Sequence, residues 1–397
     1  MTSRKLAIAG GTPAFNTPLH VGRPNMGDKD ELFRRINGLI ERRWFTNDGP
    51  LVREFEQRIS NYLGVKHCVV MCNATIALEI AIRALELRGE VIVPSYTFIA
   101  TAHALTWQQI TPVFADIDPT THNLDPRSVQ ALVTENTSAI IGVHLWGRAC
   151  DIEALNTIAK KHDLKLLFDA AHAFACSKGG QLIGTFGDCE VFSFHATKFL
   201  NSFEGGAVVT NSDDLAAKMR LMRNFGFAGY DNVVYAGTNG KLTEVCAAMG
   251  LTSLDNIDEQ LAVNSRNYAI YQKELADVPG LVVLQYDLSE RNNFQYVVVE
   301  VTRDAKLTRD EIVSVLHREN VLARKYFWPG CHLMEPYRST HSEAAHHLPN
   351  TDCVAARVIV LPTGTAVGIV EIKTVCEIIR RAMAAAAEIR GVLNHPV

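Results

Sequence analysis

The feature that most constrains the fold of this chain is a regular alternation of short apolar runs with stretches of helical spacing between residues 67 and 169. The apolar runs lie at residues 67–71, 91–93, 112–116, 139–144 and 164–169, and the helical stretches at residues 75–87, 99–107, 126–133 and 152–162. Strands that alternate with helices form βαβ units, in which helices cover both faces of a mainly parallel sheet. Apolar runs at residues 191–194 and 207–210 add two strands. The alternation therefore predicts a large α/β domain with a mainly parallel central sheet between helices.

The pattern changes beyond residue 244. Residues 244–275 are predicted to be helical and to bridge two lobes. A smaller α+β region follows, with a strand at residues 294–301, a helix whose Thr308 and Glu311 fit a capping box, and a long helix at residues 370–392. Residues 30–43 predict an early helix that packs through one face. We expect an N-terminal helical segment (1–50), a large domain (51–250), and a bridging helix with a small α+β domain (251–397).

Composition sets bounds on function. The 397 residues are 47% hydrophobic and 21% charged, which suits two globular lobes, and the net charge of −4 gives no reason to expect nucleic acid. Nine cysteines without paired metal spacing predict reduced thiols and no metal site. No run approaches the roughly 20 apolar residues of a membrane span, and the N-terminus lacks a signal-like apolar core. We therefore expect a cytoplasmic protein without a membrane partner.

Two residues in the large domain suggest specific chemistry. Asp169 ends an apolar run that has the pattern of a buried parallel strand, and the carboxyl ends of such strands are where open α/β sheets bind ligands. Lys198 follows the next apolar run. A lysine amine and a carboxylate for a pyridine nitrogen are the two groups that pyridoxal phosphate requires of a protein. Taken alone, Lys198 also fits a solvated surface lysine, and Asp169 fits a helix N-cap.

Six short motifs follow one another in order along most of the chain. They are NATIAL (73–78), PSYTFIAT (94–101), VHLWG (143–147), FDAAHA (168–173), SFHATK (193–198, followed by FEGGA at 203–207) and GTNGKLTE (237–244). Over about residues 44–362 the chain resembles nucleotide-sugar aminotransferases of the DegT/DnrJ/StrS family, within the fold-type-I pyridoxal-phosphate enzymes. The resemblance implies that fold, a transaminase activity, and Lys198 and Asp169 as the catalytic residues.

The resemblance also implies how the cofactor phosphate is held. Ala74 and Thr75 match the positions that supply amides and a hydroxyl at a helix start, and Ser193 matches a phosphate-contacting serine. The family more often has glycine at position 74, so we expect the backbone there to have a negative φ or to tolerate some strain. Asn239 matches an asparagine that reaches the phosphate of the second subunit, which implies a homodimer with shared active sites. Without the family, these residues fit a helix cap, a strand-edge hydroxyl and an ordinary turn.

Other residues of the chain match the positions that contact the cofactor ring in the family. Phe98 matches the aromatic residue that stacks on the pyridine, although periodicity alone favours a core position for it. Asp169 is expected to keep the ring nitrogen protonated. His172 matches a Gln or His that donates toward the ring hydroxyl, and a structural histidine is the alternative. Once released from the cofactor, the amine of Lys198 is expected to act as general base and acid.

The substrates follow from the resemblance less directly. The expected amino donor is L-glutamate, and the acceptor is a keto-sugar nucleotide, most like dTDP-4-keto-6-deoxyglucose. The loop at residues 324–337 combines aromatic and cationic side chains that suit an anionic, ring-shaped ligand, although it also fits a solvated connection with aromatics packed beneath it. The predicted substrate contacts are Lys241, Arg324, Tyr326 and His332. The chain departs from the family at Phe225, where histidine is commoner, and at Lys241, where arginine is commoner.

Four alternatives to this interpretation make different demands on the sequence. Related enzymes aminate C3 of a dTDP-3-keto-6-deoxyhexose, and no residue here measures the ring position. Dehydratases of the family replace the lysine with histidine, which Lys198 argues against. A regulatory protein that kept the fold and lost catalysis does not need the intact pair of Lys198 and Asp169. A nicotinamide-dependent Rossmann enzyme needs a Gly-x-Gly-x-x-Gly turn, which the segment at residues 73–75 lacks.

Overall fold

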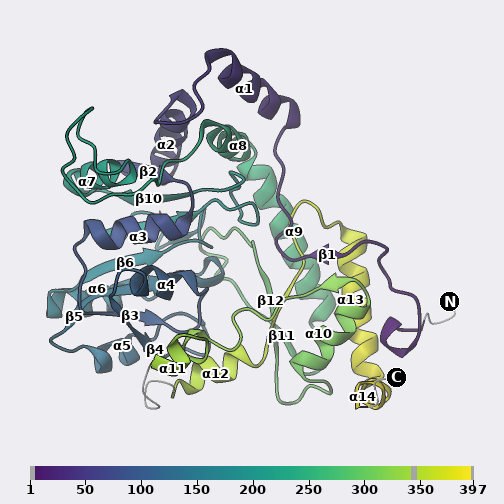
Figure 1. The fold of residues 1–397 in the computed structure, drawn as a ribbon. Coiled ribbons are helices and arrows are strands. Elements are labelled where there is room, and N and C mark those ends of the chain that lie inside the picture. The colour runs from purple at the N-terminus through teal and green to yellow at the C-terminus, as the bar shows by residue number, and fades with distance from the viewer. Residues whose placement is uncertain (1–4, 341–346, 395–397) are drawn as a thin grey trace.

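The computed structural model describes residues 5–340 and 347–394 as two lobes that are joined by the long helix α9, Ile257–Leu275 (Figure 1). The large lobe is built on a seven-stranded sheet in the order β2-β10-β9-β6-β5-β3-β4. Its strands are β2 (His67–Met71), β3 (Glu90–Pro94), β4 (Thr111–Ala115), β5 (Thr137–Val143), β6 (Lys165–Asp169), β9 (Cys189–Ser193) and β10 (Gly206–Thr210). Every neighbouring pair is parallel except the two pairs that β10 makes.

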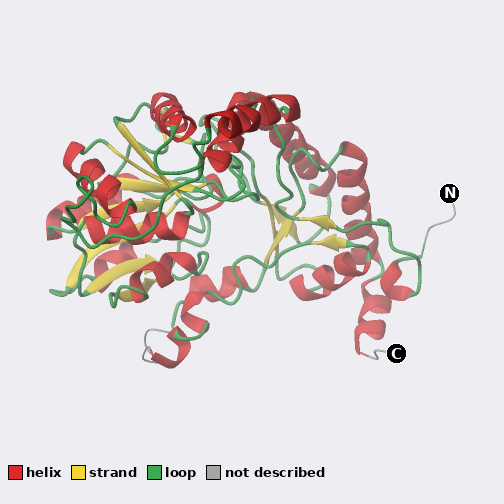
Figure 2. Cartoon of the chain, turned by 45° about the horizontal axis from the view of Figure 1, so that its top comes forward, coloured by secondary structure: helices red, strands yellow, loops and turns green. Residues whose placement is uncertain are grey.

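Helices cover both faces of this sheet, as Figure 2 shows. One face packs against α3 (Ala74–Ala84), α4 (Ala100–Thr106) and α7 (Asp213–Arg223). The other packs against α2 (Pro50–Leu63), α5 (Pro126–Leu132), α6 (Ile152–His162) and α8 (Glu244–Asp255). Successive strand residues enter opposite cores: Val69 joins the first and Val70 the second. Burial on both faces explains why these strands are continuous apolar runs in the sequence. The predicted α/β fold is confirmed.

The small lobe has an antiparallel sheet of three strands, β11 (Leu281–Val283), β12 (Val297–Val301) and β14 (Val358–Leu361). Helices α9, α10 (Arg309–Arg318), α13 (Ile369–Ala384) and α14 (Ala386–Asn394) share its core. The N-terminal segment also packs on this lobe through η1 (Ala7–Ala9) and through β1 (Leu19–His20), which pairs with β13 (Val321–Leu322). The shorter elements are β7 (Ser177–Lys178), β8 (Gln181–Leu182), η2 (Leu145–Gly147), η3 (Cys331–Leu333), α11 (Tyr337–Thr340) and α12 (Pro349–Ala355). The domain boundaries at residues 50 and 250 stay a prediction.

Some boundaries differ from the sequence-based prediction. The C-terminal helix is two helices that meet at Ala385. Strand β12 begins at Val297 rather than residue 294, because Phe294 has a φ of 46° and the side chain of Asn293 accepts the amide of Gln295. Helix α1 (Lys29–Arg42) packs one face on α8 as expected. The capping box of Thr308 and Glu311 forms. Within the described ranges, no helix is long and apolar enough to cross a membrane.

A buried carboxylate ties the start of α2 to the start of α8. Glu244 is fully buried, and its two oxygens accept the amides of Leu51 at 3.0 Å and Val52 at 2.8 Å. The N-cap of α2 is Gly49, which has no side chain to satisfy the amides of the first turn. Glu244 therefore supplies the cap from a distant part of the chain.

We expect the change Glu244→Ala to lower the free energy of unfolding by about 2 kcal/mol, because it leaves two buried amides without an acceptor. Chemical denaturation followed by circular dichroism measures this. The control Glu259→Ala removes an exposed glutamate of α9 and should change the free energy by less than about 0.5 kcal/mol. Equal effects of the two changes would contradict the capping role.

Candidate active site

A cavity of about 460 Å³ lies at the carboxyl ends of the parallel strands, where the two lobes meet. The last residues of three strands line it, namely Val143 of β5, Asp169 of β6 and Ser193 of β9. The start of α3 and the loop after β9 complete the large-lobe side, and Tyr296 and Phe327 close the cavity from beyond α9. This is the edge of an open α/β sheet where ligands are generally bound.

Asp169 lies on the wall of this cavity and is almost fully buried. One carboxylate oxygen accepts the hydroxyl of Thr101 at 2.8 Å, and the other accepts the amide of Ala171 at 3.0 Å. Burial raises the pKa of this carboxyl, while the two hydrogen bonds and the nearby charge of Lys198 oppose the rise. A turn follows Asp169 rather than a helix, so Asp169 is not a helix cap. A cationic group placed beside it would keep the carboxylate ionised.

Lys198 enters the same cavity from the loop after β9. Its amine donates a hydrogen bond to the hydroxyl of Tyr296 at 3.3 Å. Burial lowers the pKa of Lys198 to about 8, and the charge of Asp169 only partly offsets this effect. At pH 7 about a tenth of the amine is therefore unprotonated, far more than for an ordinary lysine, and this is the nucleophilic form that attacks a carbonyl carbon.

The start of helix α3, which also lines the cavity, has the chemistry to hold an anion. Helix α3 starts at Ala74, after the N-cap Asn73, whose side chain accepts the amide of Ile76 at 2.8 Å. Asn73, and not Thr75, is therefore the cap, and Ala74 has the negative φ that was expected. The amides of a first helical turn have no partner within the helix, and the helix dipole favours negative charge there. Ser193 lines the cavity at the end of β9.

The remaining walls are aromatic. Phe98 is 58% exposed and faces the cavity, so it does not occupy the core position that periodicity favoured. His172 is buried, and its Nδ1 accepts the amide of Trp146 at 3.3 Å. Burial holds the pKa of His172 well below its usual range. The ring is therefore neutral, and its other nitrogen, Nε2, carries the proton and is available as a donor.

These residues fit pyridoxal phosphate in their chemistry. The start of α3 with Thr75 and Ser193 suits a phosphate dianion, and Asp169 suits a pyridinium nitrogen. The amine of Lys198 suits the aldehyde, and the exposed ring of Phe98 offers a face for a planar heterocycle. Seven of the eight predicted cofactor positions line this one cavity: Ala74, Thr75, Phe98, Asp169, His172, Ser193 and Lys198.

Asn239, the eighth position, lies outside this cavity and is exposed. Its side-chain oxygen accepts a hydrogen bond from Lys241 at 2.7 Å, and Lys241 also donates to Asn224 at 3.1 Å. The Lys241 amine lies 4.7 Å from the centre of the Phe225 ring. Lys241, Asn224 and Phe225 line a separate, open hollow of about 520 Å³ together with Phe227 and Tyr230.

The other predicted substrate contacts lie in different surroundings. Tyr326 is in the wall of the main cavity, and Arg324 stacks on it at 4.9 Å beside an adjoining hollow of about 350 Å³. His332 is fully buried, 2.6 Å from the hydroxyl of Ser95 and 3.2 Å from Asp352. His332 does not line either cavity, so its position does not support a substrate contact. Its ring instead attaches the loop to the end of β3.

Two residues of the site were not identified from the sequence. Thr101 bonds Asp169 directly, and it stands in the motif PSYTFIAT one helical turn after Phe98, which was a usable signal. Tyr296 bonds Lys198 from the small lobe, 98 residues further along the chain. A contact between residues so far apart in the sequence leaves no local pattern from which it could be predicted.

Known proteins resemble the chain over most of its length. A model of the DegT/DnrJ/EryC1/StrS aminotransferase family matches residues 27–380. A dTDP-4-amino-4,6-dideoxy-D-glucose transaminase of Shigella dysenteriae is 37% identical over 345 residues, which cover 87% of this chain and 94% of that protein. A GDP-perosamine synthase of Caulobacter vibrioides is 38% identical over 299 residues, covering 74% and 80%.

Solved structures of sugar aminotransferases also resemble the chain. The crystal structure of DesI in the presence of its TDP-sugar product has a TM-score of 0.93 and 49% identity, and the match covers 98% of this chain and 99% of that one. The predicted fold, the transaminase class and pyridoxal phosphate as cofactor are thereby confirmed. The chain belongs to the DegT/DnrJ/EryC1/StrS aminotransferase family and is a pyridoxal-phosphate-dependent aminotransferase of nucleotide sugars.

Proposed function

We propose that this enzyme transfers the amino group of L-glutamate to C4 of dTDP-4-keto-6-deoxyglucose, which gives the 4-amino-4,6-dideoxy sugar nucleotide. The observation that carries the proposal is the cavity in which Lys198, Asp169 and the start of α3 converge. The likeness to a protein named a dTDP-4-amino-4,6-dideoxy-D-glucose transaminase and to DesI with a TDP-sugar product supports the choice of substrate.

Lys198 has two tasks in this reaction. Its amine holds the cofactor covalently until an amino donor takes its place, and the freed amine then carries a proton to and from the substrate carbon. A general base and acid works best when its pKa lies near the working pH, and burial brings the pKa of Lys198 to about 8. The cofactor, when bound, supplies a ring that accepts electrons from this carbon.

Asp169 would keep the ring nitrogen of the cofactor protonated, and the structure prepares it for this task. Thr101 and the amide of Ala171 fix both carboxylate oxygens, so the charge is oriented before any ligand arrives. Exclusion of water strengthens the interaction of such a fixed charge with a cation beside it. Ala74, Thr75 and Ser193 would bind the phosphate, His172 would donate to the ring hydroxyl, and Phe98 would cover the ring face.

The sugar nucleotide would extend from the cavity past the loop at residues 324–328. The cationic side chain of Arg324 and the aromatic ring of Tyr326 suit a diphosphate and a planar or sugar ring. Lys241 is the other cation that we assign to the substrate. Its side chain lines the separate hollow and not the main cavity of its own chain, so we assign its contact to the site of the neighbouring subunit.

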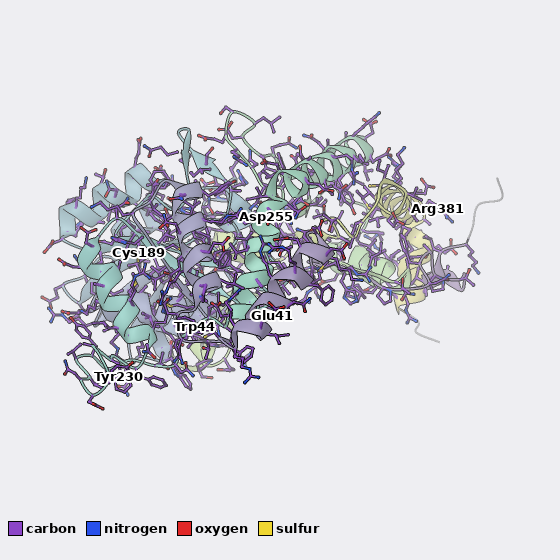
Figure 3. All side chains as sticks on the ribbon, turned by 90° about the horizontal axis from the view of Figure 1, so that it is seen from above. Glu41, Trp44, Cys189, Tyr230, Asp255 and Arg381 are labelled. Atoms are coloured by element: carbon purple, nitrogen blue, oxygen red, sulfur yellow. The ribbon has the colours of Figure 1, made fainter. Side chains whose placement is uncertain are left out.

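We propose a homodimer in which Asn239 completes the phosphate site of the partner subunit. The exposed position of Asn239, outside its own cavity, is consistent with this role. Large aromatic side chains of the large lobe are also exposed, with Trp44 at 41%, Phe225 at 45% and Tyr230 at 99%. Figure 3 shows Trp44 and Tyr230 on the same side of the large lobe. Exposed apolar side chains gathered in one region are typical of a protein interface.

The substrate is tested by incubating the protein, loaded with cofactor, with L-glutamate and a panel of keto-sugar nucleotides. The panel contains 4-keto and 3-keto hexoses linked to dTDP, and the GDP-linked 4-keto counterpart. We expect mass spectrometry and NMR to show amination at C4 of the dTDP-4-keto-6-deoxy sugar. Amination at C3, or a preference for the GDP-linked sugar, would replace the proposed substrate.

The role of Asp169 is tested by the change Asp169→Asn, which keeps the size of the side chain and removes its charge. We expect the variant to bind the cofactor and to lose about 10²-fold or more in kcat, because a fixed charge in a buried site is lost. The control Asp116→Asn alters a carboxylate that follows β4 and caps α12 outside the cavity. It should lower stability and leave kcat near that of the wild type. Unchanged kcat in Asp169→Asn would contradict the assignment.

The shared site is tested by mixing inactive Lys198→Ala chains with Asn239→Ala chains. If Asn239 acts in the partner's site, the mixed dimer has one site with both defects and one intact site, so activity should recover toward half of the wild-type value. A matched control mixes Lys198→Ala with Ser193→Ala, whose defects both affect the chain's own cavity, and should restore nothing. Equal failure of both mixtures would show that Asn239 acts within its own chain.

A further inference from the structure

Tyr296 connects the small lobe to the reacting amine. It stands directly before β12, and its hydroxyl lies 3.3 Å from Nζ of Lys198. The ring is buried and lines the main cavity together with Lys198 and His172. Of the residues that the structure describes, Asp169 is the charged group that acts on the amine of Lys198, and it belongs to the same lobe as Lys198.

Neighbouring side chains fix the orientation of Tyr296. Its ring centre is 4.4 Å from that of His172 and 5.3 Å from that of Trp146. Its backbone oxygen accepts the hydroxyl of Tyr286 at 2.9 Å. A ring held on several sides has few rotamers open to it, so the hydroxyl is a fixed point in the cavity.

The hydroxyl can serve both protonation states of Lys198. A phenol accepts a hydrogen bond from an ammonium group and donates one to a neutral amine. Burial raises the pKa of Tyr296 well above its usual range, so the phenol keeps its proton throughout the range in which Lys198 titrates. Of the other titratable groups that face the amine, burial keeps His172 neutral, and Asp169 provides the negative charge.

We propose that Tyr296 is a positioning residue for Lys198, whose hydroxyl holds the free amine toward the substrate carbon while the amine releases and regains its proton. The proposal rests on the proposed function in assuming that Lys198 is freed during turnover. It also gives the small lobe a part in the chemistry, because proton transfer then depends on a contact across the junction of the lobes.

The test compares Tyr296→Phe with Tyr271→Phe. Each change removes one buried phenol hydroxyl and keeps the ring. The hydroxyl of Tyr271 donates to the backbone oxygen of Pro362 at 2.8 Å, and Tyr271 does not line the cavity, so this variant controls for a loss of stability. We expect kcat to fall about tenfold in Tyr296→Phe, with KM for the keto-sugar unchanged, because a misplaced base slows proton transfer without weakening binding. Tyr271→Phe should keep both constants.

A second measurement needs no substrate and no cofactor. The pKa of Lys198 in the cofactor-free protein is obtained from the pH dependence of its acetylation by acetic anhydride, read by mass spectrometry of the Lys198 peptide. A hydrogen bond is stronger to an ammonium than to a neutral amine, so removing the hydroxyl should lower this pKa further. We expect a lower pKa of Lys198 in Tyr296→Phe and the wild-type value in Tyr271→Phe.

Three results would overturn the proposal. The first is an unchanged pKa of Lys198 in Tyr296→Phe. The second is a rise in KM with kcat intact, which would make Tyr296 a substrate contact. The third is an equal kinetic effect of the two changes, which would make the role of Tyr296 structural. Failure of the proposed function is distinguishable from these results. A wild-type enzyme that aminates none of the keto-sugars can still show the expected change in the pKa of Lys198.

Discussion

Burial of the Asp169 carboxylate at the end of β6 is the constraint on which the rest of the site depends. A carboxylate removed from water is costly unless its oxygens are satisfied, and here Thr101 and the amide of Ala171 satisfy them. Each partner comes from a segment that the parallel sheet brings to the same edge. Lys198 is buried in the same cavity, and its burial lowers the pKa of its amine to about 8. Removal from water therefore affects both the carboxylate of Asp169 and the amine of Lys198.

The two lobes divide the work around this pair. The large lobe supplies the anion site at the start of α3, the carboxylate and the lysine, all at the carboxyl ends of strands or at a helix start. The small lobe contributes Tyr296, Tyr326 and Phe327, whose aromatic rings form the remaining wall of the cavity. Aromatic contacts between the lobes, such as Tyr296 with Trp146 at 5.3 Å, hold these walls in place. In the proposed assignment, residues at the ends of the rigid sheet hold the cofactor, and residues of the loops contact the substrate.

The sequence carried enough information for the sheet and for most of the cofactor site. Strands buried on both faces are continuous apolar runs, and the helices between them keep a clear period, so the order of elements was predictable. Lys198 and Asp169 were predictable because their chemistry is unusual at the ends of such runs. Tyr296 was not predictable from the sequence, because its contact with Lys198 comes from the packing of the two lobes. The predicted substrate contact of His332 has no support in the structure for a similar reason. Its residue type suggested a ligand contact, whereas the fold buries its ring against Ser95. The break at Ala385 lies in an alanine-rich stretch in which no residue signals a helix end.

The central claim is that Lys198 is the residue that holds pyridoxal phosphate beside Asp169. Borohydride reduction of the protein loaded with cofactor, followed by digestion and mass spectrometry, tests it most directly, because reduction makes the bond to the lysine permanent. The account predicts the added pyridoxyl-phosphate mass on the peptide that contains Lys198, and no specific label in Lys198→Ala. Specific labelling of another lysine in the wild-type protein, such as Lys241, would contradict it.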